Sequence, residues 1–311
     1  MKIAVIGGGA VGLFLTAKLS NVNEVDVVLI TRTEEQAASI QHNQLVFQHG
    51  NQQTHLHINT LPISKASSLN VDWILLAVKQ QHMTPTFIEQ LKYLMQSQSK
   101  LLCFQNGYGH IDLLSEKIDV NSIYAAITTE GVLKKNKNQV IHTGYGNTVL
   151  GHYINNSLND VYLNKMNDVL SAAGISSSLS KNIRKETWQK LIINAVINPL
   201  TGMMKIKNGD LLTNPYVHTL MKGVFNEVMV VAQHQYADLE RDKMWKKLIT
   251  VCSNTRENKS STLQDMLNGR QTELEWITGV IIKLAKSHGI QVPMNEMLYC
   301  MIKGLEAEHL R

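Results

Sequence analysis

The sequence has few cysteines, no long apolar run and no block of like charge. Its three cysteines, Cys103, Cys252 and Cys300, are far apart and lack the paired spacing of a zinc or redox site, which favours a reducing compartment. No stretch approaches the roughly 20 apolar residues of a membrane span. The apolar N-terminus MKIAVIGGGAVGLFL has no basic leader, and glycines interrupt it where a secretory signal needs a continuous apolar core. We therefore expect a cytoplasmic protein.

Length and composition describe an ordinary globular chain. With 311 residues it exceeds the size at which a single core usually divides, so we expect two domains. Hydrophobic residues make up 44% and charged residues 18%, which excludes a disordered protein. The net charge of +5 comes from scattered Lys and Arg. This charge suits a small anionic ligand and predicts no nucleic-acid partner.

The first half alternates short apolar runs with helical patterns. The runs are KIAVIG at the start and residues 26–31, 72–78, 101–105 and 123–128. Continuous apolar strands that alternate with helices indicate βαβ units, and hence an α/β, doubly wound, mostly parallel sheet. A polar interval at 42–60 predicts an irregular strand excursion, and the later segments 185–204, 214–236 and 262–289 show helical periods. We predict a Rossmann-type domain at 1–178 and an all-α domain at 179–311.

A glycine motif follows the first predicted strand. Gly7, Gly9 and Gly12 form G-x-G-x-x-G between KIAVI and a helical stretch. There the glycines allow a tight turn, a close approach to pyrophosphate and helix-on-strand packing, with the anion at the helix N-terminus. The alternative is a loop rich in glycine only because it turns sharply. The context favours dinucleotide binding by the loop residues Gly7, Gly8, Gly9, Ala10, Val11 and Gly12.

The end of the second strand indicates which dinucleotide is bound. An NAD site usually has an acid there for the ribose hydroxyls, whereas an NADP site offers arginine to the 2′-phosphate. Here Thr31 and Arg32 come first, and acids appear only at Glu34 and Glu35. Because guanidinium pairs well with phosphate, we predict NADP(H); the alternative is that Arg32 is a solvated surface charge.

Lys79 and Asn106 follow two further strands, where ligands of parallel sheets bind, although either residue could simply cap a turn.

A polar row interrupts the apolar segment KETWQKLIINAVINPL. Lys190, Asn194 and Asn198 recur at intervals of four residues and so share a helix face. Buried polar groups need partners, which a ligand with several oxygens would supply. The alternative is an internal hydrogen-bond network with Lys190 reaching water. Pro199 removes a backbone donor, so we expect it to kink or locally end the helix.

A second polar cluster occupies 258–277. Ser261 and Thr262 precede a helical run, so N-capping explains part of it. Glu273 falls on a largely apolar face, which suggests a function, although a solvated face is the alternative. His55 and His57 resemble a metal pair, but no third ligand is apparent, so we predict a solvent-facing strand and no metal.

The sequence resembles the ketopantoate reductase (2-dehydropantoate 2-reductase) family of the 6-phosphogluconate dehydrogenase-like superfamily. The likeness runs the whole chain and is carried by GGGAVG, AVK at 77–79, QNGYG at 105–109, WQKLIINAVINPLT at 188–201, NKSSTLQD at 258–265 and TELEWITG at 272–279. Two departures are Val132, where the family often has alanine, and Thr31, where an apolar residue or glycine is common.

The resemblance implies an oxidoreductase with the substrate in a cleft between a Rossmann domain and a helical domain. It would reduce 2-dehydropantoate to (R)-pantoate with NADPH, toward pantothenate and coenzyme A. Lys190 is implied as the proton donor. Implied substrate ligands are Asn106, Lys190, Asn194, Asn198, Asn208, Asn258 and Ser261. Implied cofactor contacts are Lys79, Asn106, the backbone around Val132, and Glu273.

Elementary chemistry agrees with these roles. Hydride transfer to a ketone leaves negative charge on its oxygen, which a lysine ammonium can stabilise and then protonate. Two alternatives stay open: a reductase of another 2-keto acid, and a non-catalytic NADPH-binding sensor. We expect a small-molecule 2-keto acid partner, no membrane partner, and a possible homodimer.

Overall fold

The computed structural model describes residues 1–67, 69–154 and 158–309. The chain forms two compact units: the first comprises Met1–Gln105 and His110–Arg184, and the second comprises Asn106–Gly109 and Lys185–Arg311. The units therefore divide inside helix α6 (Ile183–Met204), and a short loop from the first half of the chain belongs to the second unit. The domain ranges 1–178 and 179–311 stay a proposal.

The first unit is built on a mostly parallel sheet. Its strand order is β12-β11-β8-β7-β6-β1-β2-β5, and β11 pairs with β8 in the antiparallel sense. All five apolar runs contribute strands, which confirms the predicted sheet. The strands are β1 (Lys2–Ile6), β2 (Asp26–Thr31), β5 (Asn59–Pro62), β6 (Trp73–Leu76), β7 (Lys100–Cys103), β8 (Ile123–Thr128), β11 (Thr148–His152) and β12 (Ser177–Leu179).

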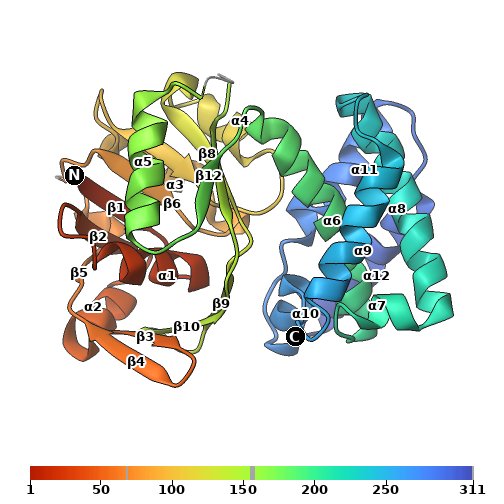
Figure 1. Ribbon diagram of the computed structural model, residues 1–311, viewed down its shortest axis with the longest axis horizontal. Coiled ribbons are helices and arrows are strands. Elements are labelled where there is room, and N and C mark those ends of the chain that lie inside the picture. The colour runs from red at the N-terminus through yellow and green to blue at the C-terminus, as the bar shows by residue number, and fades with distance from the viewer. Residues whose placement is uncertain (68, 155–157, 310–311) are drawn as a thin grey trace. The chain divides into compact units, whose positions relative to one another are not determined.

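Helices cover both faces of this sheet (Figure 1). Ile3 and Val5 of β1 pack in one apolar cluster with α1 (Ala10–Leu19) and α5 (Val161–Ala172). Ala4 and Ile6 point the other way, into a cluster with α3 (Pro85–Leu94) and α4 (His110–Ser115). Strands buried on both faces are apolar at every position, which explains why they appear as unbroken apolar runs. The unit is a three-layer Rossmann-type arrangement.

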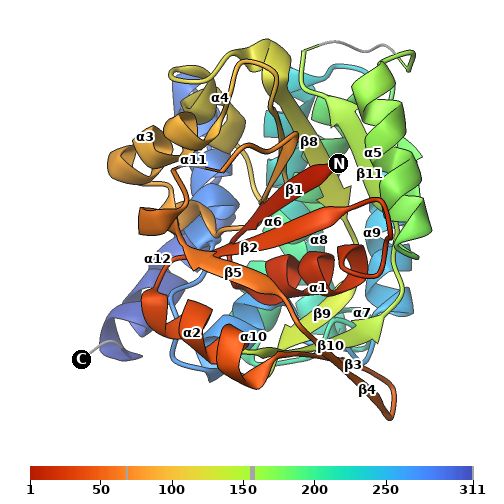
Figure 2. The same ribbon diagram turned by 90° about the vertical axis from the view of Figure 1, so that its left-hand side faces the viewer.

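A smaller sheet packs against α1, with order β4-β3-β10-β9 (Figure 2). Its strands are β3 (Leu45–His49), β4 (Gln52–Leu56), β9 (Gly131–Lys134) and β10 (Gln139–Gly144). The polar interval 42–60 thus forms β3, β4 and the start of β5, as the predicted strand excursion. The β9–β10 hairpin was not predicted. Helix α2 (Glu34–Asn43) and the short helical turns η1 (Ile63–Lys65), η2 (Gln80–His82) and η3 (Val120–Ser122) complete the unit.

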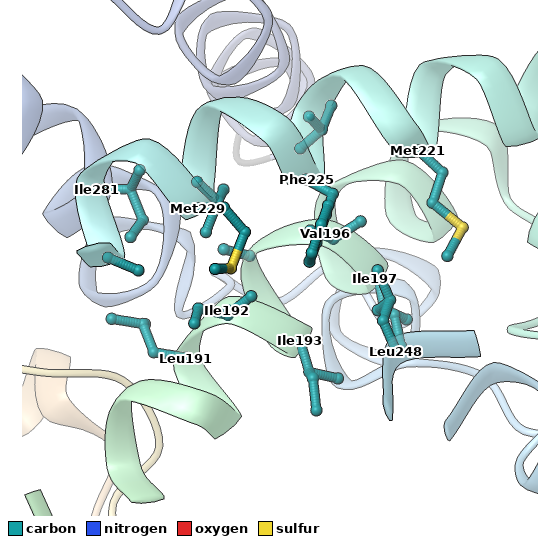
Figure 3. Close-up of a cluster of buried hydrophobic side chains, with 14 of the residues drawn as sticks. Leu191, Ile192, Ile193, Val196, Ile197, Met221, Phe225, Met229, Leu248 and Ile281 are labelled. Carbon is teal, nitrogen blue, oxygen red and sulfur yellow. The ribbon is translucent and has the colours of Figure 1, made fainter. Parts of the chain in front are cut away.

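The second unit is helical, as predicted. Beside α6 it contains α7 (Asp210–Thr213), α8 (Pro215–Gln235), α9 (Arg241–Asn254), α10 (Ser261–Leu267), η4 (Leu274–Trp276), α11 (Thr278–Ser287) and α12 (Pro293–His309). The apolar majority of α6 packs on α8, α9 and α11 (Figure 3), with Val196 beside Phe225 and Ile192 beside Met229. Among the described residues, no helix has the length and apolar character needed to cross a membrane.

Two helix predictions need correction. The segment 262–289 is not one helical period, because α10 ends at Leu267 and the chain turns through Gly269, whose φ is +60°. Pro199 was expected to kink α6 or to end it locally; it does not end α6, which continues to Met204, and the kink stays a prediction. Val196, Ile197 and Leu200 around the proline are buried in the core, and this packing holds the helix together where a backbone hydrogen bond is missing.

Candidate active site

The glycine loop between β1 and α1 has no room for side chains at two positions. Gly7 has a φ of +121°, and a Cβ there would lie 2.8 Å from the Ala77 backbone. A Cβ on Gly12 would lie 1.8 Å from the Gly7 carbonyl oxygen. Gly9 occupies the N-cap of α1 with extended backbone and no capping side chain. The open N-terminus of a ten-residue helix beside a glycine turn suits a pyrophosphate, so the loop fits a dinucleotide.

Two side chains that sequence reasoning missed hold this loop. Gln36 of α2 donates to the Gly8 carbonyl at 2.8 Å, and Lys134 of β9 donates to the same oxygen at 2.6 Å. Strand β9 also carries Val132, which pairs with His142 of β10. No pattern marks Gln36 or Lys134 in the sequence, since both act through contacts between elements far apart along the chain.

Basic side chains gather at the carboxyl ends of β2 and β6. Arg32 directly follows β2, and its Nη1 lies 3.3 Å from Nδ1 of His82 in η2. Lys79 occupies the N-cap position of η2 without a side-chain cap bond. Burial, Arg32 and Lys79 together lower the pKa of His82, so both cations act on this ring. The acids that follow Arg32 are engaged elsewhere, because Glu34 pairs with Lys65 and Glu35 with Lys137.

The second unit places Lys190 against two of its predicted companions. Lys190 Nζ donates to Asn106 Oδ1 at 2.8 Å. Burial lowers the pKa of Lys190 to about 8, and the Glu273 carboxylate opposes this shift. Glu273 is itself buried, and it begins the η4 turn instead of lying on a helix face. A half-buried ammonium with a pKa near neutrality is suited to proton transfer.

The loop Asn106–Gly109 contacts two parts of the second unit through Tyr108. The Tyr108 N–H donates to the Trp276 carbonyl at 3.1 Å, and the Tyr108 ring lies 5.3 Å from that of Trp188 on α6. Gly107 and Gly109 have φ of +86° and +94°, which lets the chain reverse so tightly. The loop thereby fixes Asn106 beside Lys190.

The rest of the polar row reaches α10. Asn198 is buried and donates to Ser261 Oγ at 3.3 Å, and Asn194 lies one turn earlier on α6, half-buried. The N-cap of α10 is Ser260, whose Oγ accepts from the Leu263 N–H, so N-capping does explain part of this cluster, and the capping residue is Ser260. Because Ser260 satisfies the helix end, Ser261 is left to interact with Asn198.

Asn208 and Asn258 are joined through their backbones. The Asn208 N–H donates to the Asn258 carbonyl at 3.0 Å, and its side-chain amide donates to Thr255 Oγ1 at 2.9 Å. Asn208 is buried, and its Oδ1 has no partner among the residues that the structure describes. An unsatisfied buried acceptor is unusual and suits a hydroxyl donor on a ligand. Asn258 is exposed.

The two histidines of the interval 42–60 were predicted to face solvent. His55 and His57 are both exposed. Within residues 1–67, 69–154 and 158–309, no three His, Cys, Asp or Glu side chains are grouped as metal ligands. Of the predicted set, Lys190, Asn106 and Glu273 form one group, Asn198 and Ser261 a second, and Asn208 and Asn258 a third, while Arg32, Lys79 and Val132 belong to the first unit with the glycine loop.

Comparison with known proteins shows which family the chain is similar to. Residues 3–155 match the family model described as ketopantoate reductase PanE/ApbA, and residues 182–306 match its C-terminal model. A 2-dehydropantoate 2-reductase of Bacillus subtilis (strain 168) is 35% identical over 313 residues, which cover 98% of each chain. The crystal structure of a probable 2-dehydropantoate 2-reductase from Bacillus subtilis is 32% identical, with a TM-score of 0.83 over 98% of this chain and 100% of that one.

The fold is shared more widely. A D-mandelate dehydrogenase in a ternary structure with NADH and anilino(oxo)acetate superposes with a TM-score of 0.91 over 100% of this chain and 99% of that one, at 23% identity. At that identity the likeness concerns the fold alone. The two family models and the full-length relative decide the assignment: the chain belongs to the ketopantoate reductase family.

Proposed function

We propose that this protein reduces 2-dehydropantoate to (R)-pantoate with NADPH, in the synthesis of pantothenate and coenzyme A, with Lys190 as the proton donor. Family membership supports the reaction, and one observation supports the role of the lysine. This observation is the half-buried Lys190 ammonium on Asn106, with a pKa lowered to about 8.

The residues of the first unit fit a phosphorylated nicotinamide dinucleotide. The glycine loop and the N-terminus of α1 would hold the pyrophosphate, and Arg32 with Lys79 would hold the 2′-phosphate. Val132, Asn106 and Glu273 complete the proposed cofactor contacts. When bound, the reduced nicotinamide supplies the hydride.

Lys190 performs two tasks in the proposed reaction. Its ammonium stabilises the negative charge that develops on the ketone oxygen, and it then donates a proton to that oxygen. Asn106 accepts a hydrogen bond from Nζ, which orients the ammonium, while Glu273 keeps enough of the lysine protonated at neutral pH by opposing the effect of burial.

Neutral polar groups of the second unit suit the rest of the substrate. Asn194, Asn198 and Ser261 can donate to the substrate carboxylate, since amides and hydroxyls donate hydrogen bonds without a change of charge. The unsatisfied Oδ1 of Asn208 can accept from the substrate hydroxyl, with Asn258 beside it. This set is expected to favour a 2-keto acid that also carries a 4-hydroxyl.

Single-turnover oxidation of bound NADPH tests the proposal. Rapid oxidation after addition of 2-dehydropantoate supports it. Equal or faster oxidation by 2-keto acids that lack the 4-hydroxyl would instead assign the protein to another 2-keto acid. Stable NADPH with every keto acid would leave a non-catalytic binding protein and refute the proposal.

The quaternary state and compartment stay predictions. A homodimer is one of the open states, and light scattering of the purified protein distinguishes it from a monomer by mass. The predicted cytoplasmic location is tested by cell fractionation.

A further inference from the structure

The imidazole of His82 has an uncommon neighbour. Its Nδ1 lies 3.3 Å from Arg32 Nη1. A guanidinium has hydrogen-bond donors and no acceptor, so Nδ1 must be the acceptor in this contact. The ring is then neutral and carries its proton on Nε2. The lowered pKa of His82, caused by burial and by the charges of Arg32 and Lys79, agrees with this neutral form.

The contact has a consequence for Arg32. The side chain of Arg32 is exposed, and an exposed arginine samples many rotamers unless a partner restrains it. Here the partner is a base and not an acid, so the guanidinium is held without having its charge neutralised. It therefore remains able to bind an anion at full strength.

We propose that His82 is a recognition residue for the 2′-phosphate of NADP(H), which positions Arg32 through Nδ1 and adds the Nε2–H as a donor of its own. The inference rests on the proposed preference for NADPH. It goes beyond the strand-end pattern, which implicates Arg32, and beyond the family resemblance, which implicates Lys79, since neither gives a role to His82. The sequence alone does not suggest it, because His82 lies 50 positions from Arg32.

Binding of cofactor fragments tests the role without turnover. Calorimetry would compare adenosine 2′,5′-bisphosphate with AMP, which lacks the 2′-phosphate. In the wild type we expect tighter binding of the bisphosphate. His82→Leu should weaken the bisphosphate roughly tenfold, the size expected for a hydrogen bond to a charged group, and should change AMP affinity by less than about twofold. His82→Asn keeps an acceptor near the position of Nδ1 and should recover part of the loss.

The outcomes separate the two proposals. If the wild type does not prefer the bisphosphate, the NADP assignment itself is wrong. If it does, and His82→Leu keeps the full preference or weakens both ligands equally, the assigned role of His82 is overturned. His55→Leu, which removes an exposed histidine of β4, is the matched control and should bind both ligands as the wild type does.

Discussion

The pKa of Lys190 predicts how the reaction depends on pH. Burial lowers the pKa of Lys190 from its ordinary value of 10.5 to about 8. With that pKa about nine lysines in ten carry a proton at pH 7, and only about one in ten does at pH 9. Because the neutral amine cannot donate a proton, we expect kcat/KM for reduction to fall about tenfold for each pH unit above about 8.

Removing the charge of Glu273 should change the pH at which kcat/KM begins to fall. The Glu273 carboxylate raises the pKa of Lys190, so Glu273→Gln removes the opposing effect and shifts the fall in kcat/KM to lower pH. The assay follows NADPH absorbance under limiting 2-dehydropantoate over the range from about pH 6 to about pH 10. Glu275→Gln is the matched control, since Glu275 is an exposed acid of η4 that bonds Tyr299.

Two results would refute the reasoning. If kcat/KM of Glu273→Gln begins to fall at the same pH as in the wild type, this carboxylate does not act on the titrating group. If kcat/KM of Lys190→Arg still falls above about pH 8, another group titrates, because arginine stays protonated throughout this range. Lys190→Arg should also lower turnover by roughly 10²- to 10⁴-fold, since the guanidinium cannot act as the proton donor.

Three further predictions follow from the same sites. Arg32→Glu should raise the KM for NADPH far more than that for NADH; equal effects in steady-state kinetics would reject the phosphate role. The pKa of Lys190 is lower in the folded protein than its ordinary value of 10.5. The buried charge therefore opposes folding at pH below about 8, and this cost disappears as the pH rises past the ordinary value. Lys190→Met should therefore stabilise the unliganded protein by about 1–3 kcal/mol at neutral pH but not at high pH in denaturant titrations, and a loss of stability at neutral pH would contradict this. Ser260→Ala removes the α10 cap and should lower the free energy of unfolding by about 1–2 kcal/mol, whereas Ser261→Ala should mainly raise the KM for the keto acid; a reversed pattern would show that their roles are exchanged.

The main sheet could be predicted from sequence because its strands are apolar on both faces. The smaller sheet was harder. Its strands β4 and β9 are largely exposed or half-buried. Strand β9 pairs only with β10, and β10 pairs with β3, about 90 residues earlier in the chain. Such pairing depends on tertiary contacts and leaves little local pattern. The break after α10 was missed because apolar spacing resumes in α11, beyond the turn at Gly269.

In the candidate site too, local patterns could be predicted from sequence, whereas contacts between distant segments could not. Helix periodicity alone placed Lys190, Asn194 and Asn198 on one face, because the three share an element. The bond from Lys190 to Asn106 spans 84 positions and depends on how the glycine loop turns onto α6, which no local pattern specifies. For that grouping the family resemblance was needed. His82 lay outside both kinds of inference.

Because Asn106–Gly109 belongs to the helical unit, no single continuous fragment of the chain contains that unit alone. The chain passes from one unit to the other three times, after Gln105, after Gly109 and after Arg184. A fragment that starts at Lys185 would retain every helix from α7 to α12 and Lys190 itself, yet it would lack the amide that holds the ammonium. Lys190 and Asn106 are therefore made in different halves of the polypeptide, so this hydrogen-bonded pair can form only after α6 has been synthesised.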